Sequence, residues 1–166
     1  KLIADTRDLY SIGFLSNARY DVEYLLPWIL LALGLNTKQL DPVEAQHLFT
    51  KFLDEQALRK RRVVLIMDEA QNLGVKLLEE LRLLSNLNRE KSLQLQIILS
   101  GQPDLQALLR RVDMTQFAQR VVVDYHIQPF TEEEVAQYIH HRVQLSGSSR
   151  PLFSPEACAL TYRLSQ

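Results

Sequence analysis

The strongest constraint on this chain is an uninterrupted apolar run at residues 63–67 that leads directly into Asp68 and Glu69. A short apolar run without polar alternation is typical of a strand covered on both faces, as in a parallel sheet. Open α/β sheets bind ligands beyond the carboxyl ends of their strands, so the two acids are expected at a ligand-binding edge. The alternative is that Asp68 and Glu69 only end the strand and cap the helix that follows.

Three further segments have the composition of strands, at residues 10–16, 94–100 and 120–126. Helical patterns separate them from one another and from the strand predicted at 62–67. Strands that alternate with helices predict a parallel sheet flanked by helices, which is an α/β fold. Apolar residues make up 46% of the chain and charged residues 23%, which fits a globular domain rather than a disordered or fibrous one.

Helix start signals divide the chain into two parts. Asp41 precedes a proline, and Thr131 is followed three residues later by Glu134 in the pattern of a capping box. Everything after about residue 130 has a helical pattern. We therefore expect an α/β core at residues 1–129 and the start of a helical subdomain at residues 130–166.

Composition excludes several classes of protein. Nineteen basic residues against twenty acidic ones give a formal net charge of −1, which supplies no overall attraction to nucleic acid or to an anionic membrane. A single cysteine, Cys158, excludes an internal disulfide framework, and we expect a packed thiol there. The longest apolar stretch, at residues 25–33, falls short of the roughly 20 residues that span a bilayer, and we expect its Trp28 in the core.

The two acids suit phosphate chemistry. Asp68, at the end of the strand, can hold a water-coordinated Mg²⁺, and Glu69 can orient or deprotonate a water that attacks a γ-phosphate. The strand predicted at 94–100 also ends in polar side chains, where a phosphate sensor would lie. Gln102 is our first candidate for that sensor and Ser100 our second, although a Gly-Gln-Pro turn into the next helix is the structural alternative. Arg120, at the start of the last predicted strand, suits a phosphate bound to a neighbouring subunit or a plain pairing with a carboxylate.

Taken in order, these motifs resemble the AAA+ ATPases, and specifically the general secretion pathway protein A type of bacterial secretion and pilus-assembly ATPase. The resemblance covers nearly the whole chain. The matching segments are 13–17 (second strand), 65–73 (Walker B), 79–87 (the following helix), 97–105 (sensor one), 119–121 (arginine finger) and 125–131 (start of the lid). The fold it implies is a P-loop NTPase-like sheet followed by the start of a helical lid.

The resemblance also implies a function. Asp68 would serve Mg²⁺, Glu69 the attacking water, Gln102 sensing, and Arg120 the nucleotide of a neighbouring subunit in a homo-oligomer. ATP and Mg²⁺ would be the cofactors of the intact parent, and envelope secretion or pilus-assembly proteins its partners. The implied location is the cytoplasm, either away from the membrane or at the inner face of the bacterial inner membrane.

One departure from the family pattern is large. A Walker A loop needs Gly-x-x-x-x-Gly-Lys-Ser/Thr, whose backbone N–H groups and lysine hold the phosphates, and none of the five glycines here precedes a lysine. In the family this loop lies just upstream of a position like Lys1, and the sensor-two arginine would fall just past Gln166. We therefore expect a piece of a longer ATPase that by itself binds ATP weakly or not at all.

The missing loop has a consequence for the sheet. In the family, the strand before the Walker A loop sits between those expected at 94–100 and 120–126. Because neighbouring strands lie about 4.8 Å apart, its loss leaves a gap that a sheet tends to close. We expect direct or distorted pairing between the two flanking strands, or poor stability.

Two other functions remain open from the sequence. The Asp-Glu-Ala-Gln segment also suits an AAA+ helper ATPase of DNA transposition, for which salt-dependent DNA affinity of the complete protein would be evidence. A non-catalytic interaction module is the other alternative, and it would be favoured if the native gene began at Lys1.

Overall fold

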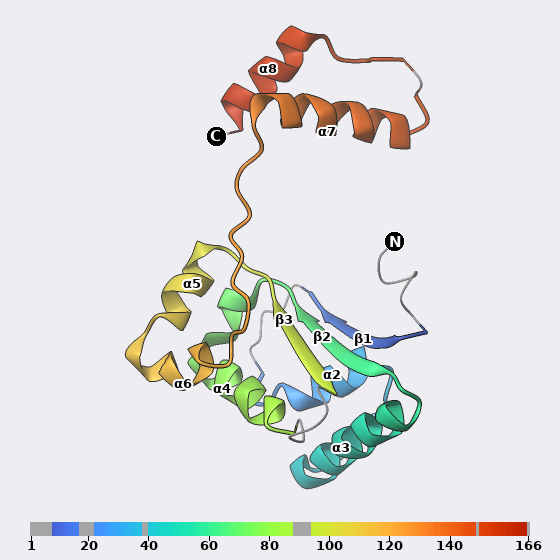
Figure 1. Cartoon of the computed structure of the whole chain (residues 1–166), viewed down its shortest axis with the longest axis vertical. Helices are drawn as coiled ribbons and strands as arrows, with labels where there is room; N and C mark the ends of the chain where they lie inside the picture. The colour runs from blue at the N-terminus through green and yellow to red at the C-terminus, as the bar shows by residue number, and fades with distance from the viewer. Residues whose placement is uncertain (1–7, 17–21, 38–39, 88–93, 149, 166) are drawn as a thin grey trace. The chain divides into compact units, whose positions relative to one another are not determined.

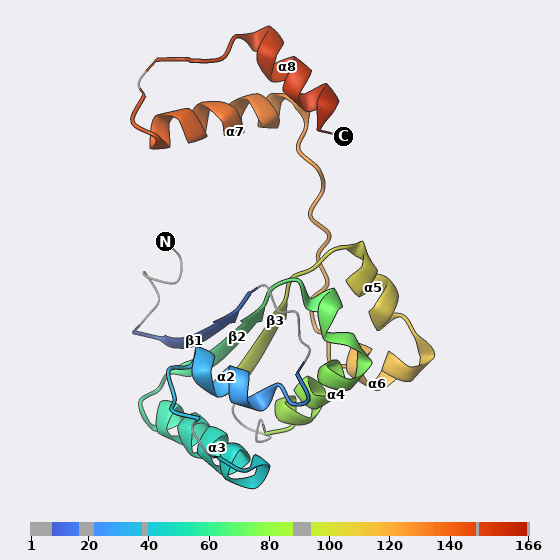
Figure 2. The same cartoon turned by 180° about the vertical axis from the view of Figure 1, so that it is seen from behind.

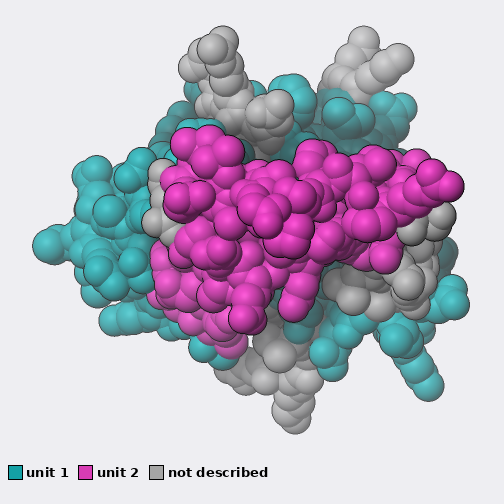
Figure 3. Space-filling model, turned by 90° about the horizontal axis from the view of Figure 1, so that it is seen from above, with its two compact units in different colours: residues 1–122 teal, residues 123–166 magenta. Residues whose placement is uncertain are grey.

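The computed structural model describes residues 8–16, 22–37, 40–87, 94–148 and 150–165. The chain divides into two compact units, Lys1–Val122 and Val123–Gln166, which are coloured separately in Figure 3. The division falls a few residues before the boundary that the sequence predicts, within the segment that follows the last helix of the first unit.

The first unit is built on a parallel sheet of three strands (Figure 1). The strands are β1 (Tyr10–Leu15), β2 (Arg62–Met67) and β3 (Leu95–Leu99), in the order β1-β2-β3. Leu15, Met67 and Leu99 pair in register, so the three strands end level with one another. The predicted parallel sheet is confirmed, and three of its four predicted strands form within a residue of the expected bounds. The apolar run at 63–67 is the middle strand.

Helices cover one face of this sheet. Figures 1 and 2 show α2 (Leu26–Ala32) and α4 (Gly74–Ser85) on the same side of the strands. The space at Gly13 of β1 is tight, because a Cβ there would lie 3.0 Å from a methyl group of Leu65 and 3.1 Å from a methyl group of Leu33, the residue after α2. α3 (Pro42–Leu58) packs against α2 and β2. The helix start predicted at Asp41 is confirmed: Asp41 accepts the N–H groups of Val43 and Glu44, each at 2.8 Å, and Glu44 Oε2 accepts the Asp41 N–H at 3.0 Å, which completes a capping box.

The other face of the sheet is less covered. Phe14, Ile66 and Ile98 share one row across the three strands, and Phe14 and Ile98 are each about half exposed. Trp28 of α2 is also half exposed, so our expectation of a core tryptophan is wrong: Leu26, Ile29 and Leu30 form the buried side of that helix. At helical spacing Trp28 lies on the opposite side of α2 from these three residues.

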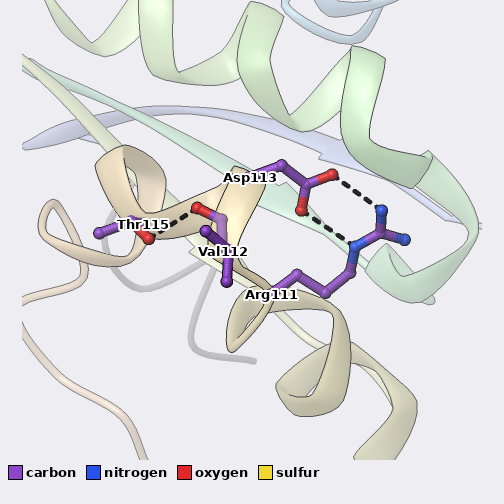
Figure 4. A network of polar contacts seen from close by, with 4 residues as sticks. All are labelled: Arg111, Val112, Asp113 and Thr115. Carbon is purple, nitrogen blue, oxygen red and sulfur yellow. Dashed lines mark hydrogen bonds and ion pairs between the residues drawn. The ribbon is translucent and has the colours of Figure 1, made fainter.

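Three short helices follow β3: α5 (Pro103–Leu109), the 3₁₀ helix η2 (Val112–Met114) and α6 (Thr115–Ala118). Figure 4 shows the polar contacts at the turn between them. The Arg111 guanidinium donates two hydrogen bonds to the Asp113 carboxylate, at 3.0 and 2.8 Å, and Thr115 Oγ1 donates to the Val112 carbonyl at 2.7 Å. This hydrogen bonding lowers the pKa of Asp113 and raises that of Arg111. The pair is exposed to solvent, so it shapes the turn more than it stabilises the fold.

The fourth predicted strand, at residues 120–126, does not form. These residues are exposed and lie outside the sheet, and the expected pairing between 94–100 and 120–126 is therefore wrong. Val122 is 94% exposed although its sequence context is typical of a strand. A strand needs a hydrogen-bonded neighbour about 4.8 Å away, and none of the described strands pairs with residues 120–126.

The second unit is a pair of helices, α7 (Glu132–Leu145) and α8 (Pro155–Leu164), that pack on each other. The capping box predicted for α7 is present, with the Glu134 N–H donating to Thr131 Oγ1 at 3.3 Å and the Thr131 N–H to Glu134 Oε2 at 2.8 Å. Cys158 is a buried free thiol, as expected. Within the described residues of both units, no helix combines the length and the apolar character that a bilayer crossing requires.

Candidate functional site

The backbone links the ends of β2 and β3. The Ser100 N–H donates to the Met67 carbonyl at 2.8 Å, and the Ala70 N–H donates to the Ser100 carbonyl at 2.9 Å. The segments that leave the two strands are therefore held side by side at the carboxyl edge of the sheet, where α/β proteins bind ligands. Asp68, Glu69, Ser100 and Gln102 all lie in these two segments.

Asp68 and Glu69, the two acids of the predicted site, lie in the segment that follows β2. The Asp68 N–H donates to the Leu15 carbonyl at 2.9 Å, which continues the pairing with β1, and Asp68 Oδ1 accepts the Glu69 N–H at 3.1 Å. Both acids are half-buried. Glu69 has a left-handed backbone, with φ 53° and ψ 40°, and starts the 3₁₀ helix η1 (Ala70–Leu73). A non-glycine residue in this conformation is uncommon and clusters at functional sites, so its occurrence on one of the two acids supports a functional role for this turn.

Gln71 is the residue that the sequence analysis missed. Its side-chain Nε2 donates to Glu69 Oε2 at 2.6 Å, and its Oε1 accepts the backbone N–H of Gln102 at 3.2 Å. Gln71 therefore connects the acid after β2 to the segment after β3. The available signal was its position two residues after Glu69 in an Asp-Glu-Ala-Gln segment, but spacing alone does not reveal a bond to a residue thirty-one positions later.

Gln102 and Ser100 occupy the edge that the sequence predicts for a sensor. Both side chains are exposed. Gln102 is also the N-cap residue of α5: its backbone is extended, Pro103 follows it, and its carbonyl accepts the Leu105 N–H at 2.9 Å. The structural alternative of a turn into the next helix is thus present, and a sensor role for the same residue is compatible with it because the Gln102 side chain makes no cap bond.

Arg120 does not take part in the described hydrogen bonds of this group. Its N–H donates to the Phe117 carbonyl at 2.9 Å, which places it in the turn after α6, and its side chain is exposed. Among the described residues, no hydrogen bond joins Arg120 to Asp68, Glu69 or Gln102. A guanidinium in this position is accessible to another molecule.

The side chains at the strand ends suit Mg²⁺ bound together with phosphate rather than a metal site made by protein alone. The described residues contain no group of three or more His, Cys, Asp or Glu arranged around one point. Mg²⁺ keeps several of its waters and is usually held by one or two carboxylates plus substrate phosphates. A single half-buried carboxylate at a strand end, Asp68, fits that chemistry.

A family model described as "AAA domain" matches residues 11–109, which is more than half of the chain. The chain belongs to the AAA domain family. The matched region includes β2, β3, all of β1 except its first residue, and the whole hydrogen-bonded group from Asp68 to Gln102.

A relative and two solved structures extend this assignment. General secretion pathway protein A of Aeromonas hydrophila is 44% identical to this chain over 109 residues. The matched residues make up 66% of this chain and 20% of that protein, so the chain spans about a fifth of the relative's length. The ORC2 protein of Aeropyrum pernix has a similar fold in its ADP form (TM-score 0.66) and in its ADPNP-ADP complexes (TM-score 0.68). Both structures are 14% identical to this chain, and each match covers 93% of it. The same matches cover 42% of the ORC2 chain in the ADP form and 41% in the ADPNP-ADP complexes. They support the P-loop NTPase-like fold expected from the sequence.

Proposed function

We propose that this AAA domain is part of an ATPase that couples ATP binding and hydrolysis to the assembly of a bacterial secretion or pilus machine. The observation that carries the proposal is the placement of Asp68 and Glu69 at the carboxyl end of the central strand, tied to the segment after β3 through Gln71. The similarity to general secretion pathway protein A supports the secretion role, and the nucleotide-containing forms of ORC2 support ATP as the ligand.

Each residue has a distinct task in this proposal. The Glu69 carboxylate accepts a proton from a water as the water oxygen forms a bond to the γ-phosphorus. The bond from that phosphorus to the bridging oxygen breaks, which releases ADP and inorganic phosphate. Asp68 holds the hydrated Mg²⁺ that neutralises phosphate charge, and Gln102, with Ser100 beside it, contacts the phosphate from the neighbouring strand.

Arg120 acts between subunits. Its exposed guanidinium, which makes no described hydrogen bond to Asp68 or Glu69, suits the γ-phosphate held by a neighbouring copy in a homo-oligomer. The envelope assembly machinery is the partner and the cytoplasmic side of the inner membrane the place of action. The 166-residue chain, which has no Gly-x-x-x-x-Gly-Lys segment, does not turn over ATP by itself.

Steady-state ATPase measurements on the complete protein that carries this domain test the proposal. Glu69→Gln should retain nucleotide binding and lower kcat by about 10²-fold or more, because the variant keeps the shape but loses the base. Arg120→Ala should leave nucleotide binding by isolated subunits intact and reduce turnover only under conditions of oligomerisation. Unchanged turnover in Glu69→Gln would overturn the assignment of the base, and equal loss in both states for Arg120→Ala would remove its role in trans.

A further inference from the structure

The two bonds of Gln71 fix which way its amide points. The Glu69 carboxylate can only accept a hydrogen bond when ionised, and the Gln102 N–H can only donate one. The amide must therefore present its NH₂ to Glu69 and its oxygen to Gln102, as observed at 2.6 and 3.2 Å. The reversed orientation would lose both bonds.

Gly101 makes room for this arrangement. A Cβ at position 101 would lie 2.5 Å from Gln71 Oε1, closer than any real contact allows, and 3.1 Å from a methyl group of Leu105. The Gln71 amide thus occupies space that only a glycine leaves open. Since the closest atom is the end of a flexible side chain, a methyl group at 101 would displace the amide at lower cost than it would distort the backbone.

We propose that Gln71 is a positioning residue that holds the Glu69 carboxylate in place and links it to the segment after β3. The inference rests on the proposed function, because it concerns the orientation of the base in that site. One oxygen of the carboxylate is bound by a neutral donor, which fixes its direction without neutralising its charge. A movement of Gln102 toward or away from a phosphate is transmitted to the base through a single side chain.

The chemistry restricts what can stand at position 71. Glutamate has the same length but cannot donate, and its charge would repel Glu69. Leucine has a similar volume and makes neither bond. A side chain with both a donor and an acceptor at this length is required, which is what distinguishes a positioning role from simple packing.

The test uses steady-state kinetics and nucleotide affinity on the complete protein. Gln71→Ala and Gln71→Leu should each lower kcat by about tenfold and leave the affinity for a fluorescent ADP analogue within about twofold, because orientation and not binding is lost. Gly101→Ala should have a similar effect from the segment after β3, because its methyl group would displace the Gln71 amide. The double variant Gln71→Ala with Gly101→Ala should be no worse than either single one, since both remove the same contact.

A matched control and an epistasis test complete the design. Asn72→Ala, at the exposed neighbour of Gln71, should keep wild-type kcat because Asn72 bonds to Glu69 only through its backbone N–H. In a Glu69→Gln background, Gln71→Ala should cause no further loss, whereas a structural role would add one. Wild-type kcat in both Gln71 variants, or full additivity of Gln71→Ala with Glu69→Gln, overturns the inference. If Glu69→Gln itself has wild-type turnover, the proposed function fails instead.

Discussion

At the scale of single residues, Glu80 is an acid whose task is structural. Its carboxylate accepts the N–H groups of Leu25 and Leu26, each at 2.9 Å. These two residues are at the start of α2, more than fifty positions earlier in the chain. α2 has no side-chain cap of its own, and Leu25 is completely buried. Glu80 on α4 therefore satisfies backbone donors at the start of α2 that water does not reach.

Replacing Glu80 should destabilise the fold by more than its exposure suggests. Glu80→Ala leaves buried N–H groups without an acceptor, and we expect the free energy of unfolding to fall by about 1–3 kcal/mol in urea denaturation. Glu79→Ala is the matched control: Glu79 pairs with Arg82 at 2.7 Å on the same helix, and such a pair contributes about 0.2–0.5 kcal/mol. Equal losses in the two variants would show that Glu80 does not cap α2.

The difference between these two adjacent glutamates also shows what a sequence reveals about single residues. Asp68 and Glu69 were predicted because they follow an apolar strand directly, and the structure places them at that strand's end. Glu80 accepts hydrogen bonds from residues more than fifty positions away, and Gln71 joins its near neighbour Glu69 to Gln102, thirty-one positions later. A local sequence pattern does not reveal these long-range partners. Trp28 shows the reverse error, since its apolar neighbours predicted a burial that the packing of α2 does not provide.

At the scale of elements, α4 is an amphipathic helix whose two sides differ sharply. Leu77, Leu78, Leu81 and Leu84 are buried against the rest of the first unit, while Leu83 of the same helix is 57% exposed. The spacing of the four buried leucines is typical of one helix face, because the helical period determines which residues share a side.

The two sides of α4 should respond differently to the same substitution. Leu78→Ala removes a side chain with no exposed surface and should lower the free energy of unfolding by about 2–5 kcal/mol. Leu83→Ala should change it by about 0.5 kcal/mol or less. Chemical denaturation followed by circular dichroism measures both, and similar losses would mean that α4 does not face the core as described.

Strands were predicted well only where their neighbours are present. β1, β2 and β3 form where alternating or continuous apolar residues indicated them, and each has a partner in the sheet. Residues 120–126 have equally good strand composition and remain exposed. Strand propensity describes a fit to a sheet surface, so it cannot predict a strand when the adjoining ladder is missing.

At the scale of the whole molecule, the fold class followed from the alternation of strands and helices, and the site from their carboxyl ends. The sequence also indicated what it lacks: no glycine precedes a lysine, so no Walker A loop is available. The described site consequently presents acids without the cationic and backbone N–H groups that hold phosphates in this family. The acids of the site and the phosphates of ATP have the same sign of charge.

The 166-residue chain should therefore bind Mg-ATP poorly. Asp68 and Glu69 are half-buried, where the repulsion between carboxylate and phosphate is stronger than in bulk water. Mg²⁺ offsets part of that repulsion, but the Walker A N–H groups and lysine that supply most of the attraction are absent. Isothermal titration calorimetry should detect no saturable heat at micromolar concentrations, whereas the complete protein should bind under the same conditions. A micromolar dissociation constant for the chain alone would mean that the carboxyl edge of β2 and β3 holds the phosphates by groups other than a Walker A loop.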